Sequence, residues 1–258
     1  MKFRPCIDIH NGKVKQIVGG SLSDTDEKVK ENFISDKNAS YYGKLYKELN
    51  LKGGHVIMLT PSYSKHFNAT KNEALEALKA YPGGMQVGGG INADNAKDYL
   101  DKGASHVIIT SWFFENGAIR YDRMEQMRNA IGKERIVVDL SCRYRDNGYY
   151  VVTDRWQTFT DVRVSNDMLI ELSDYCDEFL IHGVDVEGKG SGMEEPLVEL
   201  LTKFDRVPIT YAGGIASKSD VGKFETLSNG KLDFTVGSAL DIFSGKLPFE
   251  WVKRYNKP

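Results

Sequence analysis

The chain has 258 residues, 41% of them hydrophobic and 27% charged, which suits a globular protein with one large domain or two small ones. Its formal net charge of -2 provides no overall positive field to attract nucleic acid or an anionic membrane. We expect a cytoplasmic chain without a membrane span, because the sequence has no signal peptide and no run of about 18 apolar residues. Its three cysteines are widely spaced and form no C-x-x-C pair, which disfavours a zinc or redox motif.

Short apolar runs alternate along the chain with longer amphipathic stretches. In chain order, we expect strands at Phe3–Ile9, His55–Leu59, Met85–Val87, His106–Thr110, Arg135–Leu140, Glu178–His182, Val207–Ala212 and Leu232–Val236. We expect the helices between and after them near Tyr41–Leu51, Lys71–Tyr81, Asn92–Lys102, Arg120–Ile131, Asn166–Tyr175, Glu195–Phe204, Ser217–Leu227 and Pro248–Tyr255. Strict alternation of strands and helices implies a parallel sheet, which could be a closed barrel or an open doubly wound sheet.

An internal repeat favours the closed barrel. The matching pairs are Pro5–Ile9 with Val137–Leu140, Gly88–Ile91 with Ala212–Ile215, and Thr110–Trp112 with Gly237–Ala239. Each pair is separated by about half of the chain, and no Pro/Ser-rich linker lies between the halves. We therefore predict an α/β fold of residues 1–258 as one domain, a single (β/α)8 TIM barrel built from two similar half-barrels.

Two polar stretches interrupt this regular layout. Gly19–Asn38 follows the first expected strand, and Ser141–Asp161 follows the fifth and contains the hairpin turn signal Asn147-Gly148. In a barrel both would lie at the C-terminal face of the strands. Long loops on that face usually carry function.

Two aspartates are the first candidates for catalysis. Asp8 and Asp139 each end an apolar strand, so in a barrel both carboxylates point into the mouth of the active site. The first and fifth strands are diametrically opposite, and two carboxylates in different environments can divide into an acid and a base. A single such aspartate could equally cap a loop, but matching positions in a repeat favour catalysis.

Glycine-rich junctions in each half predict two phosphate sites. Glycines let backbone N–H groups approach an anion without obstruction by Cβ. The candidate residues of the first half are Gly88, Gly89, Gly90, Thr110 and Ser111, and those of the second half are Gly213, Gly214, Gly237 and Ser238. One Gly-Gly turn means little by itself, whereas the doubled arrangement predicts a small-molecule substrate with a phosphate at each end.

Three further residues have a functional and a structural interpretation. His182 ends the sixth strand and either contacts a substrate hydroxyl or proton, or is a hydrogen-bonded core histidine. Asp185 follows in a glycine-rich loop. Trp156, in the loop after the fifth strand, either stacks on a flat heterocycle or packs on the barrel rim.

Motifs of other enzyme classes are missing from the sequence. There is no G-x-G-x-x-G, Walker A, G-x-S-x-G or H-E-x-x-H motif, and the histidines show no metal-ligand spacing. We expect no metal and no cofactor. The interpretation that remains is proton transfer on a phosphorylated sugar.

Together these segments resemble the histidine-biosynthesis isomerase family. The resemblance lies in Pro5–Gly20, Gln86–Ile91, Val138-Asp139 and Ala212–Ile215. Family members convert 1-(5-phosphoribosyl)-5-((5-phosphoribosylamino)methylideneamino)imidazole-4-carboxamide (ProFAR) into its ribulosyl form by an Amadori rearrangement. The resemblance implies that Asp8 is the general base for the C2′ proton, that Asp139 is the general acid that helps to open the furanose ring, and that the glycine junctions hold two phosphates.

The sequence departs from the common bacterial form of the family. Met58 stands in place of an aspartate near the end of the second strand, and Asn92 stands in place of an arginine after Gly-Gly-Gly-Ile. The segments Asp139–Arg143 and His182–Gly188 resemble the branch found in fungi and plants. In that branch Asp185 could replace the acid of the bacterial sixth loop.

Two alternative functions stay open. The cyclase half of imidazole glycerol phosphate synthase also has two opposed aspartates and two phosphate sites, although Gln16–Gly20 favours the isomerase. A phosphate-binding barrel without catalysis is the other alternative, and retention of both acids argues against it. We expect a monomer, and the assignment of acid and base to the two aspartates could be exchanged.

Overall fold

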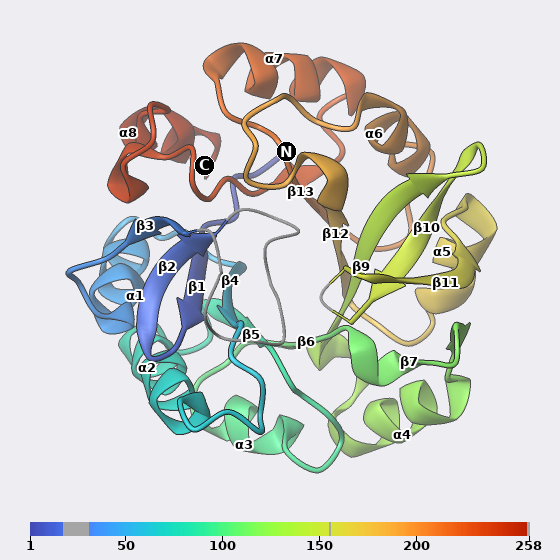
Figure 1. The fold of residues 1–258 in the computed structure, drawn as a ribbon, viewed down its shortest axis with the longest axis horizontal. Helices are drawn as coiled ribbons and strands as arrows, with labels where there is room; N and C mark the ends of the chain where they lie inside the picture. Colours follow the sequence, from blue (N-terminus) through green and yellow to red (C-terminus); the bar gives the residue numbers. More distant parts are fainter. Residues whose placement is uncertain (18–30, 155, 257–258) are drawn as a thin grey trace.

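The computed structural model describes residues 1–17, 31–154 and 156–256, and within them eight parallel strands form a closed barrel (Figure 1). Around the barrel these strands are β1 (Cys6–His10), β4 (Gly54–Met58), β5 (Met85–Gly88), β6 (Val107–Ile109), β9 (Ile136–Arg145), β12 (Glu178–Gly183), β13 (Ile209–Ala212) and β14 (Asp233–Phe234). The circle closes between the chain start and β14, where the Arg4 amide donates to the Phe234 carbonyl at 2.8 Å and the Phe234 amide donates to the Lys2 carbonyl at 3.0 Å. The predicted (β/α)8 barrel is confirmed.

Helices surround the barrel in the predicted alternation with the strands. They are α1 (Ala39–Glu48), α2 (Phe67–Ala80), α3 (Ala96–Asp101), α4 (Tyr121–Ile131), α5 (Asn166–Leu172), α6 (Glu195–Leu201), α7 (Lys218–Leu227) and α8 (Phe249–Val252). Short 3-10 turns occur at η1 (Ser111–Phe113), η2 (Lys133–Arg135), η3 (Val184–Val186), η4 (Asp241–Phe243) and η5 (Lys253–Asn256). The third helix begins four residues later than predicted, because Asn92 and Asn95 form a side-chain-bonded turn before it.

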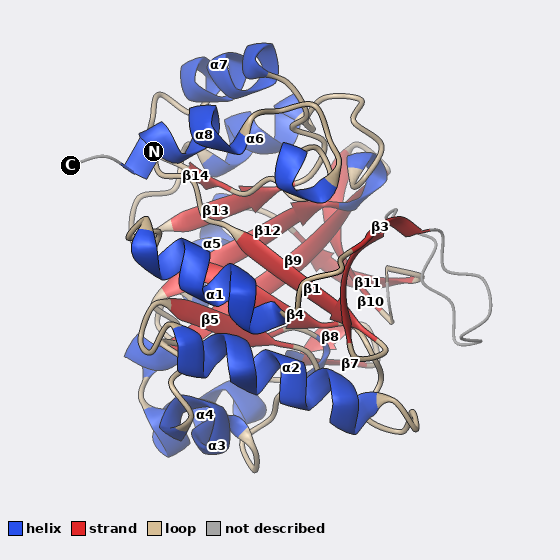
Figure 2. Cartoon of the chain, turned by 90° about the vertical axis from the view of Figure 1, so that its left-hand side faces the viewer, coloured by secondary structure: helices blue, strands red, loops and turns tan. Residues whose placement is uncertain are grey.

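Extra strands project from one end of the barrel, opposite the chain termini (Figure 2). They are β2 (Lys13–Ile17), β3 (Glu31–Ile34), β10 (Gly148–Thr153) and β11 (Thr158–Arg163), and a separate small sheet pairs β7 (Phe114–Glu115) with β8 (Ala118–Ile119). The second predicted polar stretch is therefore a hairpin extension of β9, because β9 continues to Arg145 and pairs with β10. Part of the first, residues 18–30, lies outside the described residues.

The turn of the β9–β10 hairpin lies one residue before the predicted position. Asp146 and Asn147 are its two central residues, with φ of 47° and 60°, and Gly148 is already paired with Arg145. Two successive positive φ values define the turn that suits the right-handed twist of a hairpin. The hairpin itself is confirmed.

The barrel interior is layered. Its middle is apolar and packs Ile57, Ile108, Val137, Leu180 and Ala212 against one another. This layer separates a polar group at the N-terminal ends of the strands from a polar group at their C-terminal ends. A filled barrel of this kind confines any substrate site to the rim.

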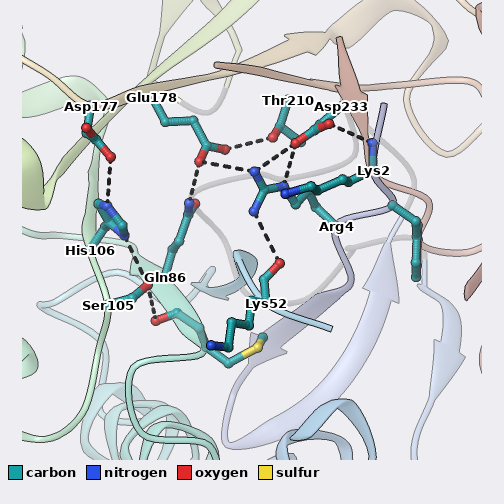
Figure 3. Close-up of polar contacts among 12 residues, drawn as sticks. Lys2, Arg4, Lys52, Gln86, Ser105, His106, Asp177, Glu178, Thr210 and Asp233 are labelled. Atoms are coloured by element: carbon teal, nitrogen blue, oxygen red, sulfur yellow. Dashed lines mark hydrogen bonds and ion pairs between the residues drawn. The ribbon is translucent and has the colours of Figure 1, made fainter. Parts of the chain in front are cut away.

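A buried ionic network closes the N-terminal end of the barrel (Figure 3). The Arg4 guanidinium lies 2.7 Å from Asp233 and 3.9 Å from Glu178. Gln86 and Thr210 donate to the two Glu178 oxygens at 2.9 and 2.7 Å. Burial raises the pKa of Glu178, while Arg4 and these two hydrogen bonds lower it. Because every carboxylate has a partner, this end is suited to stability rather than to catalysis.

Candidate active site

Two adjoining cavities open at the C-terminal ends of the strands. The larger has a volume of about 550 Å³ and includes Asp139 and Trp156 in its wall, whereas the smaller, of about 60 Å³, lies against β13 and the segment after β14. Four side chains line both cavities: Asp8, Gln16, His182 and Glu187. The two cavities therefore form one elongated cleft whose centre is these four residues.

Asp8 lies at this centre, near the end of β1. The β1–β2 hairpin folds Gln16 back over it, and the Gln16 amide donates to Asp8 Oδ2 at 3.0 Å. Burial raises the pKa of Asp8 to about 7, helped by the nearby Glu187, while His182 and the Gln16 hydrogen bond oppose the rise. A carboxyl group with this pKa exchanges a proton readily near neutral pH.

Asp139 faces the cleft from β9, across the barrel from β1 (Figure 1). Its side chain is buried and both oxygens are engaged, Oδ1 with His182 Nδ1 at 3.1 Å and Oδ2 by the Thr110 hydroxyl at 2.9 Å. Burial lowers the pKa of His182, but the charge and hydrogen bond of Asp139, with Glu187 and Asp8, outweigh that and raise it to about 9. His182 is therefore an imidazolium at neutral pH.

The first glycine junction lines the larger cavity. Gly89 and Gly90 have φ of 106° and 66°, so both adopt backbone conformations that favour glycine. A Cβ on Gly89 would lie 2.2 Å from the Met58 carbonyl oxygen, whereas one on Gly90 would meet no protein atom within 4 Å. The space in front of Gly90 is thus open to a ligand, and Thr110 and Ser111 border the same cavity.

The second glycine junction lines the smaller cavity. Gly213 and Gly214 have φ of 125° and 74°, and Gly237 and Ser238 lie beside them. The two predicted cradles are therefore at separate ends of the cleft, with Asp8 between them. This spacing suits a ligand that carries one anionic group at each end.

Trp156 and Asp185 lie in different environments. The Trp156 indole donates to the Ser141 hydroxyl at 2.9 Å and lines the larger cavity. Asp185 lines neither cavity, because its carboxylate is bonded to Arg143 Nε at 2.8 Å and accepts from the Tyr144 amide at 3.3 Å. The acidic side chain of this loop that lines both cavities is Glu187.

Comparison with known proteins adds an independent line of evidence. The sequence model of the family described as "Histidine biosynthesis protein" matches residues 2–248. This chain belongs to that family. The predicted resemblance is confirmed. The fold of this family is a TIM barrel, which is also the fold of this structure.

Several relatives are named ProFAR isomerases. The chain is 51% identical over 254 residues to a chloroplastic member from Medicago truncatula, an alignment that covers 97% of this chain and 80% of the relative. It is 47% identical to the Saccharomyces cerevisiae enzyme, with 99% and 98% covered, and 46% identical to the Neurospora crassa enzyme, with 95% and 94% covered. These relatives come from plants and fungi, the branch that the segments Asp139–Arg143 and His182–Gly188 resemble.

Sequence reasoning missed three side chains of the cleft. Gln16 was quoted only as part of the opening segment, and Glu187 only as part of the sixth loop. The sequence favours a surface or structural role for His55, yet it is buried, lines the smaller cavity, and has a pKa that burial lowers to about 3, so it is neutral. The signal that could have indicated an inward direction is the spacing of Gln16, two residues after the apolar Val14 and so on the same face of the strand.

The described residues contain neither a cluster suited to a metal ion nor a helix suited to a membrane. No group of three or more His, Cys, Asp or Glu side chains within them is arranged to hold a metal ion. In the same part of the chain, every helix is too short or too polar to span a bilayer.

Proposed function

We propose that this chain isomerises ProFAR, converting an aminoaldose to an aminoketose in histidine biosynthesis. The observation that carries the proposal is the cleft itself, with Asp8 and Asp139 on opposite strands and a glycine junction at each end. A substrate with two phosphates fits these ends. Relatives with 46–51% identity over nearly the whole chain bear the name of this activity.

The chemistry requires one base and one acid. The acid protonates the furanose ring oxygen, the C1′–O bond breaks, and the nitrogen lone pair forms a C1′=N⁺ iminium. Asp8 then removes the C2′ proton to give an enaminol, and protonation of C1′ with loss of the hydroxyl proton gives the ketose. By the family resemblance Asp139 supplies the proton for ring opening, and His182 lies 3.1 Å from it. No net oxidation occurs, so side chains suffice and no redox cofactor is needed.

The remaining residues bind the substrate. Gly88, Gly89, Gly90, Thr110 and Ser111 hold one phosphate, and Gly213, Gly214, Gly237 and Ser238 hold the other. Trp156 borders the larger cavity, where its indole stacks on the imidazole carboxamide of the substrate.

The proposal extends to the state of the protein. Residues 1–258 act as one domain and as a monomer, which the mass from light scattering tests. The cytoplasm is the proposed location, in keeping with three free cysteines, although the Medicago truncatula relative is named chloroplastic. Imaging of a fluorescent fusion tests this part separately.

A spectrophotometric assay of ProFAR turnover tests the function. We expect the wild-type protein to isomerise ProFAR, and Asp8→Asn to lower kcat by about 10²–10⁴-fold, the usual contribution of a general base. A wild-type protein without turnover would overturn the proposal. Incorporation of ammonia in the presence of a glutaminase would identify the cyclase, and tight ligand binding without turnover would identify a non-catalytic barrel.

A further inference from the structure

We propose that His182 is the proton donor for ring opening, and that Asp139 stays ionised and positions the His182 imidazole. The inference rests on the proposed isomerisation. It replaces the direct acid role that the family resemblance implies for Asp139 with a positioning role.

The hydrogen bonds of Asp139 carry the argument. Its Oδ2 accepts from the Thr110 hydroxyl, and its Oδ1 lies 3.1 Å from His182 Nδ1, which donates to it in the proposed imidazolium. A carboxylate whose two oxygens both accept hydrogen bonds presents no proton to a substrate. Because Nδ1 of His182 is engaged by Asp139, Nε2 is the ring nitrogen that remains to serve the substrate.

The position of His182 in the cleft supports the same assignment. The sugar that loses its C2′ proton must lie beside Asp8, and its ring oxygen must be reached by the donor. His182 and Asp8 line both cavities, whereas Asp139 lines only the larger one. His182 therefore borders all of the space that Asp8 borders, and Asp139 does not.

The charges around His182 keep it protonated. Asp139 on β9, Asp8 on β1 and Glu187 after η3 all raise its pKa, to about 9, against the effect of burial. His55 on β4 is the other titratable group that faces it, and that imidazole is neutral because burial lowers its pKa to about 3. An imidazolium held by three carboxyl groups is available as an acid across the neutral range.

The proton balance returns both groups to their starting states. The His182 imidazolium gives its Nε2 proton to the ring oxygen as the C1′–O bond breaks, which leaves a neutral imidazole. Asp8 takes the C2′ proton and later returns it to C1′. The neutral imidazole then takes the C2′ hydroxyl proton as the ketone forms. No atom or electron is gained or lost over the cycle.

The test compares His182→Asn with Asp139→Asn across pH. The Asn amide nitrogen occupies the place of Nδ1, so His182→Asn keeps the hydrogen bond to Asp139 and removes only the acid. We expect it to lower kcat by about 10²–10⁴-fold, to change KM much less, and to abolish the alkaline limb of kcat/KM near pH 9. His106→Asn is the matched control, because His106 Nε2 lies 3.2 Å from Asp177 in a similar pair near the opposite end of the barrel. This variant should leave the pH profile of kcat/KM unchanged.

Asp139→Asn should behave differently. It removes the charge that holds the imidazolium, so we expect activity to persist at lower pH while the alkaline limb moves down by about one pH unit or more. The proposal would be overturned if His182→Asn kept the alkaline limb and a kcat within about tenfold of wild type while Asp139→Asn was inactive at every pH. Asp139 would then be the proton donor. Loss of the limb in Glu187→Gln alone would make Glu187 the donor and would equally overturn the proposal.

A measurement without turnover separates this inference from the proposed function. Titration of ¹⁵N-labelled histidine in the wild-type protein reports the charge of His182 directly, and it is decisive even where a variant folds poorly. We expect His182 to be protonated at pH 7 and to titrate near 9, and to titrate lower in Asp139→Asn. A neutral His182 at pH 7 would overturn the inference, whereas failure of ProFAR turnover would overturn the function alone.

Discussion

Alanine in place of Gly89 should cost far more stability than alanine in place of its neighbour Gly90. At Gly89 the φ of 106° is unfavourable for a residue with a side chain, at about 1–3 kcal/mol. The new Cβ would also lie 2.2 Å from the Met58 carbonyl oxygen and 2.8 Å from the Met58 Cβ. Moving a packed strand end away from such a contact costs about 1–3 kcal/mol more. We therefore expect Gly89→Ala to lose about 2–6 kcal/mol of unfolding free energy.

Gly90→Ala is the matched control for this prediction. Its φ of 66° is left-handed, which costs about 1–2 kcal/mol for alanine, and its Cβ would meet no protein atom within 4 Å. The methyl group would instead enter the larger cavity, which Gly90 lines. We expect a small loss of stability and a raised KM for ProFAR, because the methyl group occupies phosphate space.

Urea unfolding and steady-state kinetics measure the two effects separately. The unfolding free energy, taken at an unchanged m value, should separate the two variants by about 1 kcal/mol or more. Equal losses of stability in both variants would refute the clash at Gly89. An unchanged KM in Gly90→Ala would refute the placement of a phosphate in front of that residue.

Two further predictions concern buried charge. Because folding raises the pKa of Asp8 to about 7, the contribution of its protonated form to stability is complete below pH 4 and is lost as the pH rises through 7. Asp8→Asn should therefore be about 2–4 kcal/mol more stable than wild type at pH 8. Equal urea midpoints of the two proteins at pH 8 would contradict this prediction. Arg4→Met leaves Glu178 and Asp233 buried without their cation, so we expect a loss of about 3–5 kcal/mol of unfolding free energy with kcat unchanged. The control is Lys97→Ala, which breaks an exposed ion pair and should cost under about 0.5 kcal/mol. Thermal unfolding measures both losses.

The regular part of the fold could be predicted because its signals are local. Each parallel strand is a short apolar run, and the repeat between the two halves identifies the closed barrel. The β2 strand was not predicted, because Lys15 and Gln16 are polar yet buried, and their pairing with β1 depends on tertiary contacts. The late start of α3 has a similar cause, since Asn92 prefers a side-chain-bonded turn to a helix.

The candidate site could be predicted only as far as strand ends determine it. Asp8 and Asp139 were candidates because each follows an apolar run and because the two occupy matching positions in the repeat, which needs no knowledge of loops. Asp185 and Glu187 are two residues apart in one loop, and sequence alone does not say which enters the cleft. The 3-10 turn Val184–Val186 decides it by turning Asp185 toward Arg143, so that Glu187 lies at the cavity.

The duplicated halves provide a symmetric frame, and the loops make it chemically asymmetric. Burial raises the pKa of Asp8 to about 7, and its hydrogen-bond partner, the neutral amide of Gln16 from a hairpin of the same half, only partly opposes that rise. Asp139, at the matching position in β9, instead contacts a hydroxyl and an imidazole, those of Thr110 and His182. Because a general base works best with a pKa near the working pH, this difference favours Asp8 as the base in the proposed mechanism. The proposed acid is then His182, which lies 3.1 Å from Asp139.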